Sequence, residues 1–109
     1  METFRQILSF DSTSGSEREL GEWLAAHLEA PSVETMEVGD GTVNVFLKWG
    51  EPSVVFCSHM DTVPPYIPPT FLEDRITGRG TCDAKGQFYA MYRACQRLAA
   101  TGIIKDILM

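Results

Sequence analysis

The apolar positions of this chain repeat with two different periods. In two stretches they recur every three or four residues, which predicts amphipathic helices. The positions are Leu20, Trp23, Leu24 and Leu28 in one stretch and Phe88, Met91, Tyr92, Cys95, Leu98 and Ala99 in the other. We expect the first of these helices to stop before Pro31 and the second, over residues 83–101, to end at Gly102. A shorter helix is expected from Phe4 to about Phe10, and His27, off the apolar stripe, at the surface.

Between the helices, the apolar residues follow strand patterns. Residues 33–38 and 42–49 flank Gly39-Asp40-Gly41, which is typical of a β-hairpin turn. The run Val54-Val55-Phe56-Cys57 predicts a short strand buried on both faces, and residues 105–109 begin a last strand. The order α-α-β-β-β-α-β predicts an α/β fold, a three-layer α/β/α mixed sheet with at least one antiparallel pair.

Two local signals concern the connections. Ser14-x-x-Glu17 and Ser16-x-x-Glu19 both match the capping box that precedes a helix. The proline-rich run 64–69 cannot be helix or central strand, so we expect a stiff surface loop. This loop serves either as a rigid connector, which is slightly favoured, or as a wall of a substrate site.

Composition narrows the class of protein. A chain of 109 residues forms at most one domain, and its net charge of −6 argues against nucleic acid or an anionic membrane as a partner. It has neither an apolar run of membrane-spanning length nor a signal-peptide pattern at its N-terminus. Three widely spaced cysteines do not make a disulfide framework, so we expect a cytoplasmic protein with reduced thiols.

The most informative residues are His59 and Asp61, at the end of the predicted strand that starts at Val54. In extended backbone, positions i and i+2 point to the same side, so the two side chains can meet. A carboxylate that accepts one ring N–H leaves the other imidazole nitrogen free to bind a metal. The alternative is a histidine at a strand end with a solvated aspartate nearby.

A second feature is the glycine-punctuated loop 75–86, which places Asp83 just before the last helix. A dinucleotide fingerprint would need glycine at Asp83, and a phosphate-binding loop would need Gly-Lys followed by Ser or Thr, whereas Lys85 precedes Gly86. A carboxylate near a strand-end histidine instead fits a divalent cation with mixed nitrogen and oxygen ligands.

These two motifs together resemble the N-terminal signatures of the co-catalytic zinc aminoacylase/carboxypeptidase family. That family includes acetylornithine deacetylase, succinyl-diaminopimelate desuccinylase and glutamate carboxypeptidases. The resemblance runs from Asn44 through the helix after Lys85, and its motifs are Ser58-His59-Met60-Asp61-Thr62-Val63-Pro64 and Gly78-Arg79-Gly80-Thr81-Cys82-Asp83-Ala84-Lys85-Gly86.

The resemblance implies a role for each matching residue. His59 would bind one zinc ion, Asp61 would be the catalytic-site carboxylate that orients His59, and Asp83 would bridge two zinc ions. Cobalt or manganese could substitute for zinc. The peptide bond after Asp83 would be cis, and Ala84 stands where the family more often has methionine. Arg79 and Lys85 more often make structural contacts than substrate contacts at such positions, and we expect buried structural roles for Cys57 and Cys82.

The resemblance also implies a function, metal-assisted hydrolysis of amide bonds in N-acyl amino acids or small peptides, closest to acetylornithine deacetylation. For the full-length protein it allows a homodimer. The family's Glu-Glu pair, later carboxylate and distant histidine have no counterpart in these 109 residues. We therefore interpret residues 1–109 as the N-terminal part of one catalytic domain, inactive by itself. The alternative is a truncated, non-enzymatic module that binds a partner or binds metal weakly.

Overall fold

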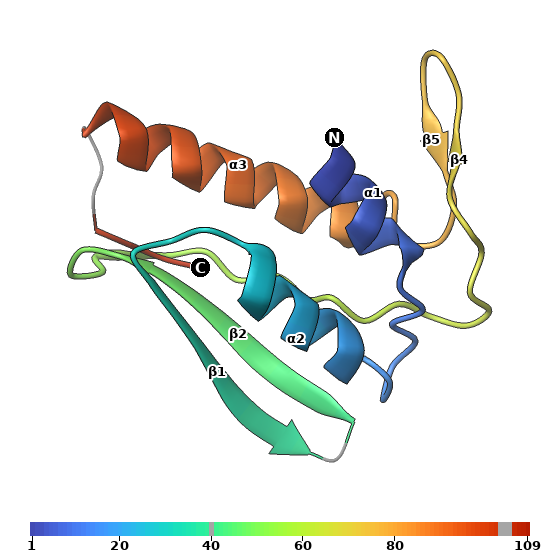
Figure 1. Cartoon of the computed structure of the whole chain (residues 1–109), viewed down its shortest axis with the longest axis horizontal. Coiled ribbons are helices and arrows are strands. Elements are labelled where there is room, and N and C mark those ends of the chain that lie inside the picture. The colour runs from blue at the N-terminus through green and yellow to red at the C-terminus, as the bar shows by residue number, and fades with distance from the viewer. Residues whose placement is uncertain (40, 103–105) are drawn as a thin grey trace.

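A computed structural model describes residues 1–39, 41–102 and 106–109 of the chain (Figure 1). Three helices and six strands occur in these ranges. Their order and bounds are α1 (Glu2–Ser9), α2 (Arg18–His27), β1 (Ser32–Gly39), β2 (Thr42–Trp49), β3 (Val54–Val55), β4 (Thr70–Phe71), β5 (Ile76–Thr77), α3 (Lys85–Thr101) and β6 (Ile107–Leu108). None of the described helices is long and apolar enough to cross a membrane.

The main sheet has four strands in the order β1-β2-β6-β3. β1 pairs antiparallel with β2 from Ser32 opposite Lys48 to Gly39 opposite Thr42, with one irregularity between Glu37 and Gly39. β6 lies antiparallel to β2 and parallel to β3. The expected α/β class with a mixed sheet and an antiparallel pair is therefore confirmed.

The core lies where α2 and α3 meet one face of this sheet. In β2 the buried residues Val43, Leu47 and Trp49 are separated by even numbers of positions, so they lie on the same face, as expected for a strand with one covered face. Leu47 and Trp49 join the predicted apolar faces of the helices in one cluster, whose other members include Leu20, Leu24, Leu28, Phe88, Tyr92, Cys95 and Ile107. The described helices all contribute to this one core. The helical layer that the three-layer fold would place over the opposite face of the sheet stays a prediction.

The helix predictions hold closely. α3 buries Phe88, Tyr92 and Cys95 along one stripe and ends at Gly102, which adopts the left-handed conformation at φ 71°. It begins at Lys85, two residues later than expected. α1 buries Phe4, Ile7 and Leu8 and ends before Phe10, and His27 is exposed as predicted.

One strand prediction needs correction. β3 contains only Val54 and Val55, whose exposed fractions are 42% and 64%, so this strand is not buried on both faces. It is short because it pairs with only two residues of β6 and has no described partner on its other side. The predicted turn at Asp40 and the start of the last strand at Lys105 lie outside the described residues.

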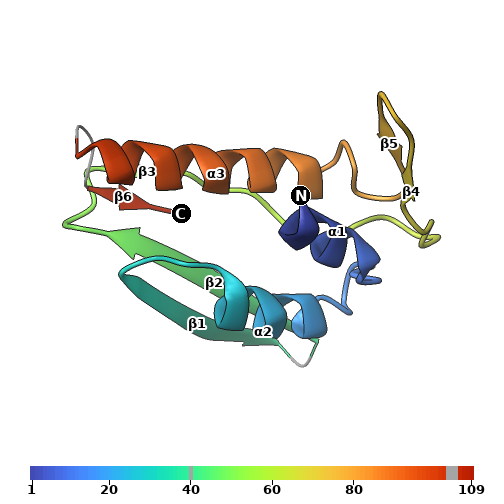
Figure 2. The same cartoon turned by 45° about the horizontal axis from the view of Figure 1, so that its top comes forward.

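The small hairpin of β4 and β5 was missed by the sequence patterns. Its two-residue strands pair antiparallel and project away from the rest of the molecule (Figure 2). Between β3 and this hairpin the chain runs alongside α3 toward α1 (Figure 2). That connecting segment, residues 56–69, carries the first motif.

Candidate metal centre

The side chains of His59 and Asp61 meet, as their spacing predicts. Nδ1 of His59 lies 2.9 Å from Oδ1 of Asp61 and 3.1 Å from the backbone oxygen of the same residue. Because an ionised carboxylate and a carbonyl can only accept hydrogen bonds, Nδ1 carries the proton. In the neutral imidazole, Nε2 then holds a free lone pair.

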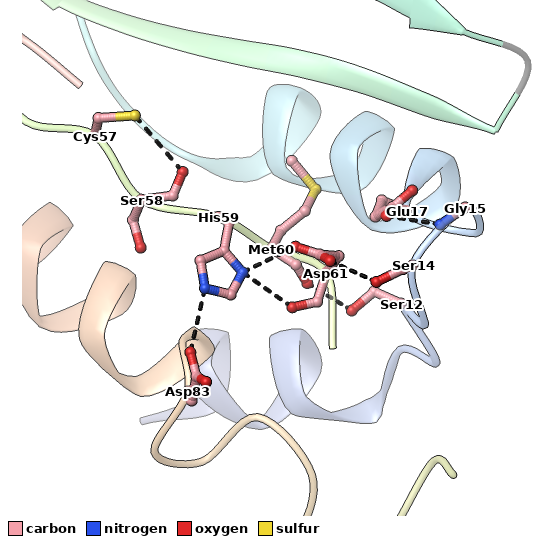
Figure 3. Close-up of polar contacts among 10 residues, drawn as sticks. All are labelled: Ser12, Ser14, Gly15, Glu17, Cys57, Ser58, His59, Met60, Asp61 and Asp83. Atoms are coloured by element: carbon pink, nitrogen blue, oxygen red, sulfur yellow. Dashed lines mark hydrogen bonds and ion pairs between the residues drawn. The ribbon is translucent and has the colours of Figure 1, made fainter. Parts of the chain in front are cut away.

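That second nitrogen faces Asp83. Nε2 of His59 and Oδ1 of Asp83 are 3.2 Å apart, although the two residues come from the connecting segment and from the loop before α3 (Figure 3). The peptide bond between Asp83 and Ala84 is cis, as the family resemblance implies. The fold therefore brings the three site residues of the sequence analysis together.

Ser14 joins this group, and the sequence analysis assigned it a different role. Its hydroxyl donates a 2.6 Å hydrogen bond to Oδ2 of Asp61 (Figure 3). The predicted capping boxes are wrong, because α2 begins after Glu17 and no side chain caps it. The Glu17 carboxylate instead accepts the backbone N–H of Gly15 at 2.8 Å.

The loop that carries Ser14 is paired with the segment that carries Asp61. Thr13 and Thr62 form a parallel bridge, in which the N–H of Thr62 donates to the oxygen of Ser12 at 2.9 Å and the N–H of Ser14 to the oxygen of Thr62 at 3.1 Å. The buried hydroxyl of Ser12 donates to the oxygen of Met60 at 2.7 Å. No local sequence signal connects these two stretches, which are 47 or more residues apart.

The electrostatics of the site favour bound positive charge. The hydrogen bond from Ser14 is the main cause that lowers the pKa of Asp61, with the contact to His59 adding to it against the opposing effect of burial. Burial acts to lower the pKa of His59, but the hydrogen bonds and charge of Asp61, with the charge of Asp83, outweigh it and raise the pKa. One imidazole thus lies between two carboxylates.

This donor set fits a divalent metal ion. With Nδ1 protonated, the lone pair of Nε2 of His59 faces an oxygen of Asp83, and two acceptors at 3.2 Å repel each other unless a cation or a proton lies between them. Two ligands at typical zinc distances and a tetrahedral angle are separated by about 3.3 Å. In the ranges 1–39, 41–102 and 106–109, however, no group of three or more His, Cys, Asp or Glu side chains is arranged to hold a metal ion.

The two cations near the site make structural contacts, as expected. Lys85 is fully buried and its ammonium donates to the backbone oxygen of Phe10 at 2.7 Å. Burial lowers its pKa to about 8. Nε of Arg79 donates to the oxygen of Pro65 at 3.1 Å, and the hydroxyl of Tyr66 lies 3.0 Å from the oxygen of Ser9. These bonds tie the proline-rich loop to its neighbours, which supports the rigid-connector interpretation.

The prediction of buried cysteines in the motifs is wrong. Cys57 and Cys82 are exposed, and Cys95 in α3 is the buried thiol. Cys57 is exposed because the strand expected to bury it ends at Val55. It lines a groove of about 340 Å³ between β2 and the segment 55–61, into which Leu24 and Phe88 also project.

Comparison with known proteins identifies the family. Residues 55–107, which span His59, Asp61 and Asp83, match the model of Peptidase family M20/M25/M40. Over this range, just under half of its length, the chain is similar to this family. A member of the co-catalytic zinc aminoacylase/carboxypeptidase family was the expectation from the two motifs, and the match covers both of them.

Curated relatives agree with this M20 assignment. A Peptidase M20 domain-containing protein of Schizosaccharomyces pombe is 31% identical over 94% of this chain, and a probable carboxypeptidase of Aspergillus terreus is 33% identical over 93%. An N-acetyl-L-citrulline deacetylase of Xanthomonas campestris is 32% identical over 86%. The aligned regions make up 28%, 26% and 29% of those proteins, so the chain spans less than a third of their length.

Proposed function

We propose that this M20 chain carries part of the two-zinc centre of a hydrolase that cleaves C–N bonds. One observation supports the proposal most directly. Asp61 occupies Nδ1 of His59, and Nε2 faces an oxygen of Asp83 at 3.2 Å. This arrangement leaves one imidazole nitrogen and one carboxylate directed at the same point, as metal ligands must be.

In this proposal each residue has a distinct task. His59 would hold one ion through Nε2, Asp83 would supply a carboxylate shared by the two ions, and Asp61 would fix the tautomer and orientation of His59. When bound, zinc ions polarise an acyl carbonyl and activate water at neutral pH. Cobalt and manganese accept the same nitrogen and oxygen ligands.

The substrate we propose is an N-acyl amino acid or a small peptide. Two of the relatives named above are a probable carboxypeptidase and an N-acetyl-L-citrulline deacetylase, and both names describe hydrolysis of an amide bond. Acetylornithine is the first substrate to test. In these relatives the M20 region is one part of a longer protein. The proposed substrate is that of such a whole protein.

A zinc titration tests the metal centre. In the ¹⁵N NMR spectrum of the chain, added Zn²⁺ should shift Nε2 of His59, and Asp83→Asn should weaken the apparent affinity about 10-fold or more because it removes a charged ligand. Glu73→Gln, an exposed carboxylate on the β4–β5 hairpin, is the matched control. Unchanged His59 signals at saturating Zn²⁺ would contradict the proposal.

We further propose that the isolated 109-residue chain is inactive, even with zinc. His59 and Asp83 supply two ligands, whereas zinc sites use three or four protein ligands. Turnover of acetylornithine above a zinc-only blank, lost in His59→Ala, would refute this.

A non-enzymatic module that binds metal weakly is the second candidate, because no larger ligand group occurs among the described residues. Tight binding of two zinc ions by this chain would exclude it.

A further inference from the structure

Four side chains form one continuous line of polar contacts through the proposed metal centre. The hydroxyl of Ser14 contacts Asp61 at 2.6 Å, Asp61 contacts His59 at 2.9 Å, and His59 contacts Asp83 at 3.2 Å (Figure 3). Asp61 is the only member with a donor on each carboxylate oxygen, His59 on Oδ1 and Ser14 on Oδ2. The two donors together determine the orientation of its carboxylate plane.

Without the bond from Ser14, that plane would be poorly determined. The terminal torsion of an aspartate is broad, so one hydrogen bond to one oxygen leaves considerable freedom of rotation. The side chain of Asp61 is 39% exposed, so water can also compete for its oxygens. A short O–H···O⁻ bond of 2.6 Å is charge-assisted and about twice as strong as a neutral one.

The backbone holds Ser14 in register with Asp61. The N–H of Ser14 donates to the oxygen of Thr62, and the hydroxyl of Ser12 donates to the oxygen of Met60. Met60 and Thr62 are the two neighbours of Asp61 in the chain. The backbone of the serine loop is therefore hydrogen-bonded on both sides of the carboxylate that Ser14 binds, which keeps the main chain of Ser14 within reach of Asp61.

We propose that Ser14 is a positioning residue of the metal centre. Its hydroxyl holds Asp61 in the orientation that keeps the proton of His59 on Nδ1 and presents Nε2 to a metal ion. This inference rests on the proposed function for its metal, but its first step, the effect of Ser14 on the imidazole of His59, exists in the metal-free chain.

The test is ¹⁵N NMR of the two histidines in the full 109-residue chain, without metal and then with Zn²⁺, at a pH where both imidazoles are neutral. His27 is an internal reference, because its Nδ1 contacts the oxygen of Trp23 at 2.8 Å, away from the site. The variants are Ser14→Ala, Ser14→Thr, which keeps the hydroxyl, and the control Ser16→Ala. Ser14 and Ser16 are both exposed, so neither alanine variant opens a cavity in the core.

We expect His59 to be the Nδ1–H tautomer in the unmodified chain, in Ser14→Thr and in Ser16→Ala. In Ser14→Ala, we expect a mixture of the two tautomers at His59 and an apparent zinc affinity lower by about 10-fold, at the small end of what loss of a supporting contact costs. The signals of His27 should not change.

Two results would overturn the role of Ser14. One is an unchanged tautomer and zinc affinity in Ser14→Ala, and the other is an equal loss in Ser14→Thr, which would assign the effect to local packing and not to the hydroxyl. Failure of the metal centre itself is distinguishable. In that case the ¹⁵N signals of His59 in the unmodified chain do not change when Zn²⁺ is added. The tautomer of His59 measured without metal, in the unmodified chain and in Ser14→Ala, still tests whether Ser14 positions His59.

Discussion

Lys85 has an unusual environment for a charged residue outside the proposed metal centre. Its side chain is fully buried, and its ammonium donates to the backbone oxygen of Phe10, which joins the first turn of α3 to the end of α1. Its methylenes also lie close to Gly80, where a Cβ would be 2.9 Å from Cδ of Lys85. The residue therefore connects the loop that carries Asp83 to the loop that carries Ser14.

Lys85→Ala should lower the free energy of unfolding by about 2–4 kcal/mol, because it leaves a cavity and removes the donor of the Phe10 carbonyl. Thermal and urea unfolding measure the change. Arg97→Ala is the control on the same helix, since Arg97 is exposed, and it should stay within about 0.5 kcal/mol of the unmodified chain. Equal stability of the two variants would contradict this role of Lys85.

At the scale of elements, the close contact between α3 and the glycine loop depends on Gly86. A Cβ at Gly86 would lie 2.1 Å from the backbone oxygen of Thr81, a distance that real Cβ atoms do not reach. The N–H of Gly86 also donates to the oxygen of Gly80 at 3.2 Å. The helix can begin this close to the loop only without a side chain here.

Gly86→Ala should therefore destabilise the protein by about 1–3 kcal/mol, the usual cost of overpacking. In an ordinary helix the same change stabilises, by roughly 0.5–1 kcal/mol. Gly39→Ala is the control, because a Cβ there meets no atom within 4 Å. Chemical unfolding measures the free energy of unfolding of both variants. A stabilising effect of Gly86→Ala would contradict the prediction and show that the loop at Thr81 moves to accommodate the new side chain.

The first turn of α2 is joined to β1 by an ion pair. The guanidinium of Arg18 donates to both carboxylate oxygens of Glu37, one of them at 2.8 Å, and to the backbone oxygen of Gly39 at 3.0 Å. The bond from Arg18 is the main cause that lowers the pKa of Glu37 below its ordinary 4.5. A carboxylate with a lowered pKa stabilises the fold above its unfolded pKa and loses that contribution as the pH falls through its folded value.

The difference in Tm between the unmodified chain and Glu37→Gln should therefore be constant near neutral pH and shrink below about pH 4.5. Both partners are at the surface, so the difference should be modest and decrease with added salt. Glu34→Gln, exposed on the same strand, is the control. A difference that grows on acidification would have the wrong sign.

On the scale of the whole molecule, β1 and β3 are the outer strands of the sheet. An outer strand offers unpaired backbone groups to another chain, and β3 adds two exposed valines, Val54 and Val55. The chain of 109 residues also leaves the groove beside this strand open. We expect copies of the chain to associate with one another at high concentration through the β3 edge.

Light scattering across a wide range of concentrations measures this association. Val55→Lys should suppress it, because a lysine on an outer strand discourages pairing with a second chain. Val63→Lys is matched, since Val63 is equally exposed at 62% but lies outside the strands, and it should leave association unchanged. A monomer at every concentration would contradict the prediction.

What the sequence alone determined are features encoded over short distances. The bounds of β2, the stripe of Phe88, Tyr92 and Cys95 and the end of α3 at Gly102 follow from local periodicity and from the conformational freedom of glycine. The contact between His59 and Asp61 follows from a spacing of two residues. The proximity of Asp83 was predicted from its place in the motif and from the family resemblance.

The tertiary structure alone decided features that depend on pairing between distant segments. The exposure of β3 depends on which strands lie beside it, and β4 and β5 are too short for any periodicity to be visible. The sequence around Ser14 matches the capping pattern whether or not the serine caps a helix, and its hydroxyl in fact binds Asp61, 47 residues away. That partner is selected by the bridge between Thr13 and Thr62, and a contact between two distant backbone segments leaves no local pattern of residues to detect.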